Sequence, residues 1–206
     1  KFMKKWDKLA DKKTIENTVA ALKANGIDAQ VVENGKAAKV KVLELIPDGS
    51  EVMTMSSVTL DTIGLSEEIN KADSRFRPVR DKLYAMDRKT QQQEMNRLGA
   101  APEFAIGSVH AVTEDGHVLI ASATGSQLPA YVYGAGKVIW VVGTQKIVKN
   151  TNEGIQRIYE YVFPLEDKRA RAAYGMGSGV NKLLIVNKEF APGRITVILV
   201  KEKLGF

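Results

Sequence analysis

The chain has 206 residues, of which 44% are apolar, and it carries a formal net charge of +6 with no cysteine. The lack of cysteine excludes disulfides, thiolate nucleophiles, and zinc or iron–sulfur sites built from thiolates. No apolar stretch approaches the roughly 18 residues of a membrane-spanning helix, and the N-terminal residues show no secretory signal pattern. We therefore expect one domain over residues 1–206, in the cytoplasm and without a membrane span.

The first half of the chain is predicted to alternate helices with strands, after a helical N-terminal portion over about residues 1–25. In residues 3–25 the apolar side chains fall near one stripe, and Asn25-Gly26 is a typical helix stop. Ser66 is predicted to cap a short helix, and Pro78 to open a long one that ends near Leu98. The other expected elements are strands at 27–33 and 50–55 and helices at 36–46 and 67–71.

The second half is predicted to contain a hairpin and a buried central strand. Two strands between Val109 and Ala121 pair across Glu114-Asp115-Gly116, which is a strong turn signal. The run 138–142 is apolar on both faces, as in a strand covered on both sides. This alternation predicts a layered α/β fold with a largely parallel sheet. The remaining expected elements are strands at 103–106, 183–187 and 195–200 and helices at 129–133, 155–162 and 164–174.

The segment Ala123-Thr124-Gly125-Ser126-Gln127 follows a predicted strand and precedes a predicted helix. Amide groups in the first turn of a helix lack intrahelical partners, and the helix dipole favours a negative ligand there. We therefore predict that Thr124, Gly125, Ser126 and Gln127 contact an anion. The alternative is a routine strand-to-helix turn with a Ser or Thr cap. The glycine spacing matches neither a P-loop nor a dinucleotide fingerprint.

A second candidate segment, Gly143-Thr144-Gln145-Lys146, follows the buried strand. Ligands of open α/β sheets collect beyond the carboxyl ends of the strands, so Lys146 and Asn150 are predicted ligand contacts. The alternative is a loop whose lysine is solvated.

Glu114 at the hairpin tip is the candidate catalytic residue, acting in acid–base chemistry if it faces a cleft. The alternative is a solvated glutamate beside a turn that Asp115-Gly116 makes. His110 and His117 flank the same turn, but their spacing matches no metal motif, so no metal site is predicted.

The basic residues of the chain are not arranged as a nucleic-acid surface. Arg75, Arg77 and Arg80 cluster and could clamp an anion, but a surface cluster paired with Asp73 and Asp81 is favoured. No basic face carries aromatic or groove-reading elements, so no nucleic-acid partner is expected.

Several segments together resemble the LUD-domain family, the lactate-utilisation proteins of the LutC and YkgG type. The likeness extends over nearly the whole chain. The segments that carry it are Trp6, Thr59–Gly64, Gly107–Gly116, Ala123–Gln127, Gly143–Lys146 with Asn150, and Ile195–Glu202.

The resemblance implies a three-layer α/β/α fold related to NagB, ribose-phosphate isomerase and the CoA transferases, in a bacterial or archaeal protein. In related folds the hairpin glutamate and the Gly-rich loops border the ligand site, which brings Glu114, Gly125, Ser126 and Lys146 together. Some relatives serve a multi-subunit system that oxidises L-lactate, with partner subunits that carry iron–sulfur clusters. This chain could not hold such a cluster through thiolates, because it has no cysteine.

Three functions follow as expectations, and the residues leave open whether the chain is an enzyme. The first is binding of a small anionic metabolite or cofactor of unknown identity, as an accessory subunit in lactate or other organic-acid oxidation. The second is a stand-alone isomerase or acyl-transfer or ligase-type enzyme on a phosphorylated or CoA-linked substrate, with Glu114 as base or nucleophile. The third is an assembly protein that acts through contacts with iron–sulfur subunits.

Overall fold

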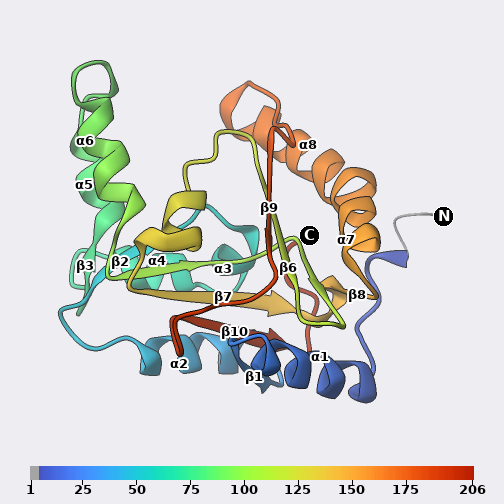
Figure 1. The fold of residues 1–206 in the computed structure, drawn as a ribbon. Coiled ribbons are helices and arrows are strands. Elements are labelled where there is room, and N and C mark those ends of the chain that lie inside the picture. The colour runs from blue at the N-terminus through green and yellow to red at the C-terminus, as the bar shows by residue number, and fades with distance from the viewer. Residues whose placement is uncertain (1–4) are drawn as a thin grey trace.

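The computed structural model describes residues 5–206, which form a six-stranded sheet with helices on both sides (Figure 1). Every neighbouring pair of strands in this sheet is parallel. The arrangement confirms the predicted three-layer α/β/α fold with its parallel central sheet. From edge to edge the strands are β1 (Asp28–Val32), β10 (Ile195–Val200), β7 (Lys137–Gly143), β4 (Phe104–Gly107), β2 (Glu51–Thr54) and β3 (Arg77–Pro78).

The two faces of the central sheet bury alternate side chains of the same strands. In β7, Ile139 and Val141 pack on one face, where they meet buried residues of the helices α2 to α4. Trp140 and Val142 pack on the other face with Leu22 of α1. This period of two on a strand that is apolar throughout is what burial on both faces requires. The helices named here are α1 (Lys12–Ala24), α2 (Gly35–Leu45), α3 (Val58–Thr62) and α4 (Leu65–Asn70).

A second, four-stranded sheet covers part of the face that carries Trp140, and the sequence did not predict it. Val112 and Ile120 face Trp140, whereas Leu119 faces Ile158 and the helices beyond. In Figure 1 its strands β6 and β9 lie side by side and run across the direction of β7. The predicted hairpin is confirmed as the antiparallel pair β5–β6. The strands, in order, are β8 (Ile147–Val148), β5 (Ala111–Thr113), β6 (Val118–Ser122) and β9 (Lys182–Val186).

The helix predicted over residues 3–25 is shorter in the structure. Residues 5–7 form a separate turn, and α1 begins at Lys12 because the Asp11 side chain accepts from the Thr14 amide at 2.8 Å. Residues 3 and 4 lie outside the described part of the chain. The predicted Ser66 cap is also wrong: Gly64, with φ 66°, precedes α4, and Leu65 begins the helix with its side chain buried.

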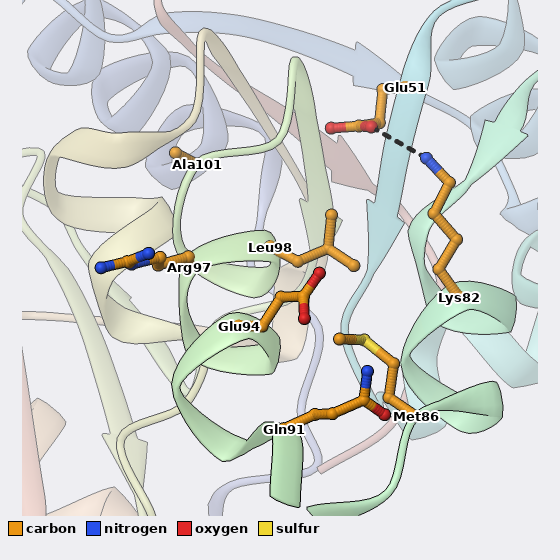
Figure 2. A pocket seen from close by; sticks show the side chains of 8 residues that line it. All are labelled: Glu51, Lys82, Met86, Gln91, Glu94, Arg97, Leu98 and Ala101. Carbon is orange, nitrogen blue, oxygen red and sulfur yellow. Dashed lines mark hydrogen bonds and ion pairs between the residues drawn. The ribbon is translucent and has the colours of Figure 1, made fainter.

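The long helix predicted from Pro78 to Leu98 is two helices, α5 (Val79–Ala85) and α6 (Arg88–Ala100). Met86 is extended and Asp87 caps the second helix, so the chain turns between them. Figure 1 shows the pair projecting beside the edge of the sheet that holds β2 and β3. A cleft of about 550 Å³ opens at their base, between the Glu51–Lys82 ion pair and side chains of α6 (Figure 2).

The helices predicted at 155–162 and 164–174 are joined into one helical segment. It consists of α7 (Thr151–Arg157), a π-helical turn (Ile158–Val162) and α8 (Phe163–Tyr174). Pro164 lies within the first turn of α8, directly after the π-helical turn. The locally altered hydrogen-bond ladder accommodates the missing proline donor, so the helix does not end there. Within residues 5–206, no helix combines the length and apolar character needed to cross a bilayer.

Candidate functional site

A buried lysine lies where two central strands end. The chain leaves β7 in a single 3-10 turn, Thr144–Lys146, which directs Lys146 inward with only 2% of its surface exposed. Its Nζ lies 3.2 Å from Thr59 Oγ1, 3.0 Å from Ser108 Oγ and 3.1 Å from the Val109 carbonyl oxygen. Ser108 and Val109 follow β4, so the carboxyl ends of β4 and β7 form the site together. The alternative of a solvated Lys146 is therefore wrong.

The segment after β10 closes this site from another side. Gln145 Nε2 donates to the Leu204 carbonyl at 2.9 Å, and Thr59 Oγ1 donates to the same oxygen at 3.2 Å. Gly143 makes the approach possible, because a Cβ there would lie 2.6 Å from the Glu202 carbonyl oxygen. The site thus depends on a small residue at the end of β7.

Burial changes the charge state that Lys146 favours. Desolvation lowers the pKa of Lys146 well below its ordinary value, and repulsion from Arg157 lowers it further. An uncharged amine donates two hydrogens and accepts one, which the Val109 carbonyl and the hydroxyls of Thr59 and Ser108 can match. The group can therefore act as a hydrogen-bond partner, a base or a nucleophile.

Arg157 is a buried cation close enough to Lys146 to repel its charged form. It ends α7 with no exposed surface, its Nη1 donates to the His110 carbonyl at 2.5 Å, and its guanidinium lies 5.2 Å from the ring centre of Tyr161. Burial lowers the pKa of Arg157 to about 10, although Tyr161 and Asp7 oppose the shift. The guanidinium stays charged at neutral pH, so the site carries a fixed positive charge.

His110 joins this site to the loop that follows β6. Its Nδ1 accepts from the Ala121 amide at 2.9 Å, which leaves the ring hydrogen on Nε2 in the neutral form. Burial, then Lys146, then Arg157 lower the pKa of His110 to about 3. The imidazole is neutral at physiological pH and offers one N–H near the Lys146 amine and the Arg157 guanidinium.

Replacing His110 by asparagine is expected to make the protein more resistant to acid. Because the folded pKa of about 3 lies below the ordinary value of 6.5, the unfolded chain binds more protons between these values. This contribution to stability is complete above pH 6.5 and is lost as the pH falls towards 3. Urea unfolding at pH 7 and pH 4.5 should show that the free energy of unfolding falls less between these pH values in His110→Asn than in the unsubstituted protein. The asparagine amide oxygen can still accept from the Ala121 amide. If the free energy of unfolding falls as much in His110→Asn as in the control His117→Asn, the assignment of a lowered pKa to His110 is contradicted.

The predicted loop Thr124–Gln127 lies next in the chain after the strand that contacts His110. Several of its donors already have partners: the Gly125 amide donates to Ser122 Oγ at 2.8 Å, and the Ser126 amide to Thr124 Oγ1 at 3.3 Å. Gln127 Oε1 accepts from Ser122 Oγ at 2.9 Å. The helical segment that follows is short, so anion binding by this loop stays a prediction.

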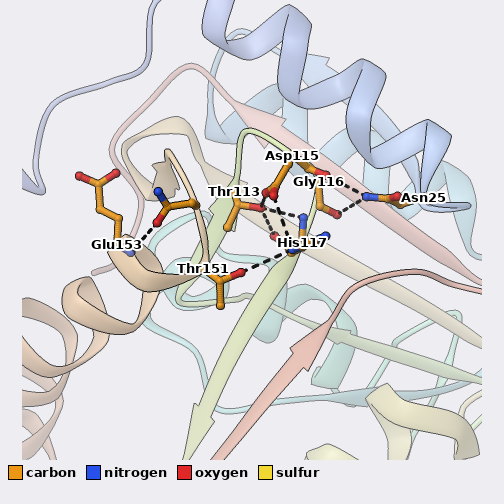
Figure 3. A network of polar contacts seen from close by, with 8 residues as sticks. Asn25, Thr113, Asp115, Gly116, His117, Thr151 and Glu153 are labelled. Carbon is orange, nitrogen blue, oxygen red and sulfur yellow. Dashed lines mark hydrogen bonds and ion pairs between the residues drawn. The ribbon is translucent and has the colours of Figure 1, made fainter.

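Glu114 and Asn150 lie away from Lys146. Strands β5 and β8 pair in parallel, and extending their register places Ala111 opposite Lys146 and Glu114 opposite Lys149. The backbone of Glu114 therefore lies about 10 Å from that of Lys146 along the strand direction. Figure 3 shows the hairpin turn held by Asn25, whose Nδ2 donates to the Asp115 carbonyl at 2.9 Å, and His117 beside Thr151. Asn150 caps α7 by accepting from the Glu153 amide at 3.0 Å.

Of the predicted site residues, the structure places Lys146 in this buried cluster. Sequence reasoning did not select Thr59, Ser108 or Arg157, and it considered His110 only as a metal ligand. One signal was available: Arg157 lies among apolar residues of a predicted helix, where a charged side chain is unusual. None of the predicted site residues lines the cleft at the base of α5 and α6. Within residues 5–206, no three acidic, histidine or cysteine side chains gather as metal ligands would.

Comparisons with known proteins agree with this architecture. The chain is similar to a crystal structure of a DUF162 family protein from Deinococcus radiodurans, with 11% sequence identity and a TM-score of 0.58 over 94% of this chain and 99% of that chain. This likeness concerns the fold. No curated protein matches the chain. The model of the LUD domain matches residues 15–200, which include both sheets and the buried cluster. The chain therefore belongs to the LUD-domain family.

Proposed function

We propose that this chain binds a small anionic metabolite at the carboxyl ends of β4 and β7. The observation that carries the proposal is Lys146, buried at this edge with Arg157 close enough to repel it. Burying the Arg157 guanidinium close to the Lys146 amine, whose protonation it opposes, is costly unless an anion compensates the positive charge. Ser108 and His110 are partly exposed and give a ligand polar groups to contact.

The position in the fold supports the same function. Loops beyond the carboxyl ends of parallel strands are where α/β sheets collect ligands. The net charge of +6 favours the approach of anions over that of cations to the protein as a whole. Ser108 is partly exposed and its hydroxyl lies 3.0 Å from Lys146 Nζ, so an anion that contacts Ser108 would lie within reach of the amine.

Within this proposal, the chain serves as an accessory subunit in the oxidation of lactate or another organic acid. It would bind the anion while partner subunits carry the electrons through iron–sulfur clusters. The 206 residues contain no cysteine, so electron transfer through thiolate-held clusters would fall to the partners.

A second candidate function is catalysis by the chain itself, and the lowered pKa of Lys146 favours it. A buried lysine with a lowered pKa is suited to work as a base or nucleophile. In this case Lys146 would take the role that the sequence assigned to Glu114.

Thermal unfolding in the presence of L-lactate, inorganic phosphate, a nucleotide and a CoA ester tests the proposed function. A ligand at one hundred times its Kd stabilises the folded state by about 2.7 kcal/mol, so a clear rise in Tm is expected for at least one anion. Ser108→Ala should reduce that rise. Ser126→Ala should leave it unchanged if the ligand lies at Lys146, and should reduce it if the loop Thr124–Gln127 is the site. No stabilisation by any of these anions at saturating concentration would refute the proposal.

A further inference from the structure

The guanidinium of Arg157 uses only one of its nitrogen atoms. Nη1 donates to the His110 carbonyl, whereas Nε and Nη2 are buried and have no hydrogen-bond partner within residues 5–206. A buried donor without an acceptor costs about 1–3 kcal/mol, and more when the group is charged. Two nitrogen atoms of the buried guanidinium therefore lack acceptor oxygens within residues 5–206.

The two unused nitrogen atoms form the edge of a guanidinium that binds a carboxylate side-on. Arg169 shows this geometry in the same helical segment: its Nε and Nη2 donate to the two carboxylate oxygens of Glu166, each at 2.7 Å. Two parallel N–H donors match the spacing of two carboxylate oxygens. At Arg157 the corresponding edge is buried and has no acceptor among residues 5–206.

Residues 5–7 pack against the helical segment that carries Arg157 and add another donor without a partner among residues 5–206. Lys5 pairs with Glu153 at 3.0 Å, and Asp7 accepts from the Tyr161 hydroxyl, so Trp6 lies alongside the face of the helix that carries Arg157. The buried Trp6 Nε1 also has no partner within residues 5–206. The Trp6 indole and the Arg157 guanidinium thus both hold buried donors without an acceptor among residues 5–206.

The nearby carboxylate of this chain is already engaged. Asp7 Oδ1 accepts from Tyr161 and pairs with Lys203 Nζ at 2.6 Å, and its pKa is lowered by these two partners and by Arg157, against the effect of burial. The negative charge of Asp7 stabilises the buried Arg157 cation, but Asp7 makes no hydrogen bond to the guanidinium.

We infer that the Nε–Nη2 edge of Arg157 binds the carboxylate of a small organic acid, close to Asp7, His110 and Lys146. This inference rests on the proposed function and names the class of its ligand. A carboxylate fits better than a phosphate, because it is planar and singly charged and a dianion costs more to bury. Trp6 Nε1 would donate to the same ligand.

The full chain, with its arginine Nε–H groups observed by NMR, tests the inference directly. Addition of acetate or L-lactate should shift the Arg157 signal in a saturable way and leave the Arg169 signal unchanged. Arg157→Lys keeps the charge and loses the bidentate edge, so carboxylate affinity should fall about tenfold or more. Arg169→Lys, which alters a partly exposed pair on the same helical segment, is the matched control.

The outcomes separate this inference from the proposed function. Binding of acetate or lactate that Arg157→Lys weakens and Arg169→Lys does not supports it. Binding of phosphate that depends on Ser108 and Lys146, with no response of Arg157 to any carboxylate, overturns the inference and leaves the proposed function standing. Absence of binding of every anion removes both. The NMR signal of the unsubstituted protein decides the matter even if Arg157→Lys fails to fold.

Discussion

Replacing Lys146 by methionine is expected to abolish anion binding at the carboxyl ends of β4 and β7. Methionine has a similar length and an apolar, flexible side chain, so it can occupy the buried space without the amine. Its introduction leaves the Val109 carbonyl and the hydroxyls of Thr59 and Ser108 without the amine as their shared hydrogen-bond partner. The cost of these unpaired groups opposes the gain from removing a buried amine, so we expect the effect on binding to exceed the effect on stability at pH 7.

The same substitution should remove a dependence of stability on pH. The pKa of Lys146 in the folded protein lies well below the ordinary value of 10.5. Between these two values the unfolded chain binds more protons than the folded protein, so stability rises with pH until about 10.5. In Lys146→Met this rise is lost.

Urea unfolding from pH 7 to pH 10 measures the difference. Lys149→Met is the control, since Lys149 lies three residues further on and is exposed. The free energy of unfolding of the control should keep the rise seen in the unsubstituted protein. An equal rise in Lys146→Met would show that the folded protein holds Lys146 charged, and would contradict the assignment of a lowered pKa.

Replacing Trp140 by alanine is expected to destabilise the fold by about 3–5 kcal/mol. Trp140 is fully buried in β7 and packs edge to face on Tyr131, with ring centres 5.3 Å apart. It lies opposite Gly107 of β4, where a Cβ would fall 1.8 Å from the Tyr131 hydroxyl. No neighbour can fill the space of an indole ring in this close-packed region, so a cavity remains.

Chemical denaturation of Trp140→Ala and of Phe190→Ala provides the comparison. Phe190 is 99% exposed, so its loss should change the free energy of unfolding by less than about 0.5 kcal/mol. A change below about 1 kcal/mol in Trp140→Ala would show that the two layers on either side of β7 can close the gap, against the packing described here.

The sequence alone determined the elements whose signals are local. The apolar run at 138–142 marked the central strand, and Glu114-Asp115-Gly116 marked the hairpin turn, because periodicity and turn residues act over a few positions. It also placed Lys146 after a strand end, where ligands are expected. Local signals did not predict the break at Met86–Asp87, where Asp87 caps a new helix. They also did not predict that the helical segment continues through Pro164, after a π-helical turn.

Only the tertiary structure decided which residues form the site and what charge they favour. Thr59, Ser108, Lys146 and Arg157 come from four separate stretches of the chain, and no spacing within the sequence links them. The second sheet joins β5 to β8 and β6 to β9, pairings that depend on long-range contacts. Burial then lowers the pKa of Lys146 and, among residues 5–206, leaves an edge of Arg157 without an acceptor. Desolvation is a property of the packed protein and not of any residue in the sequence.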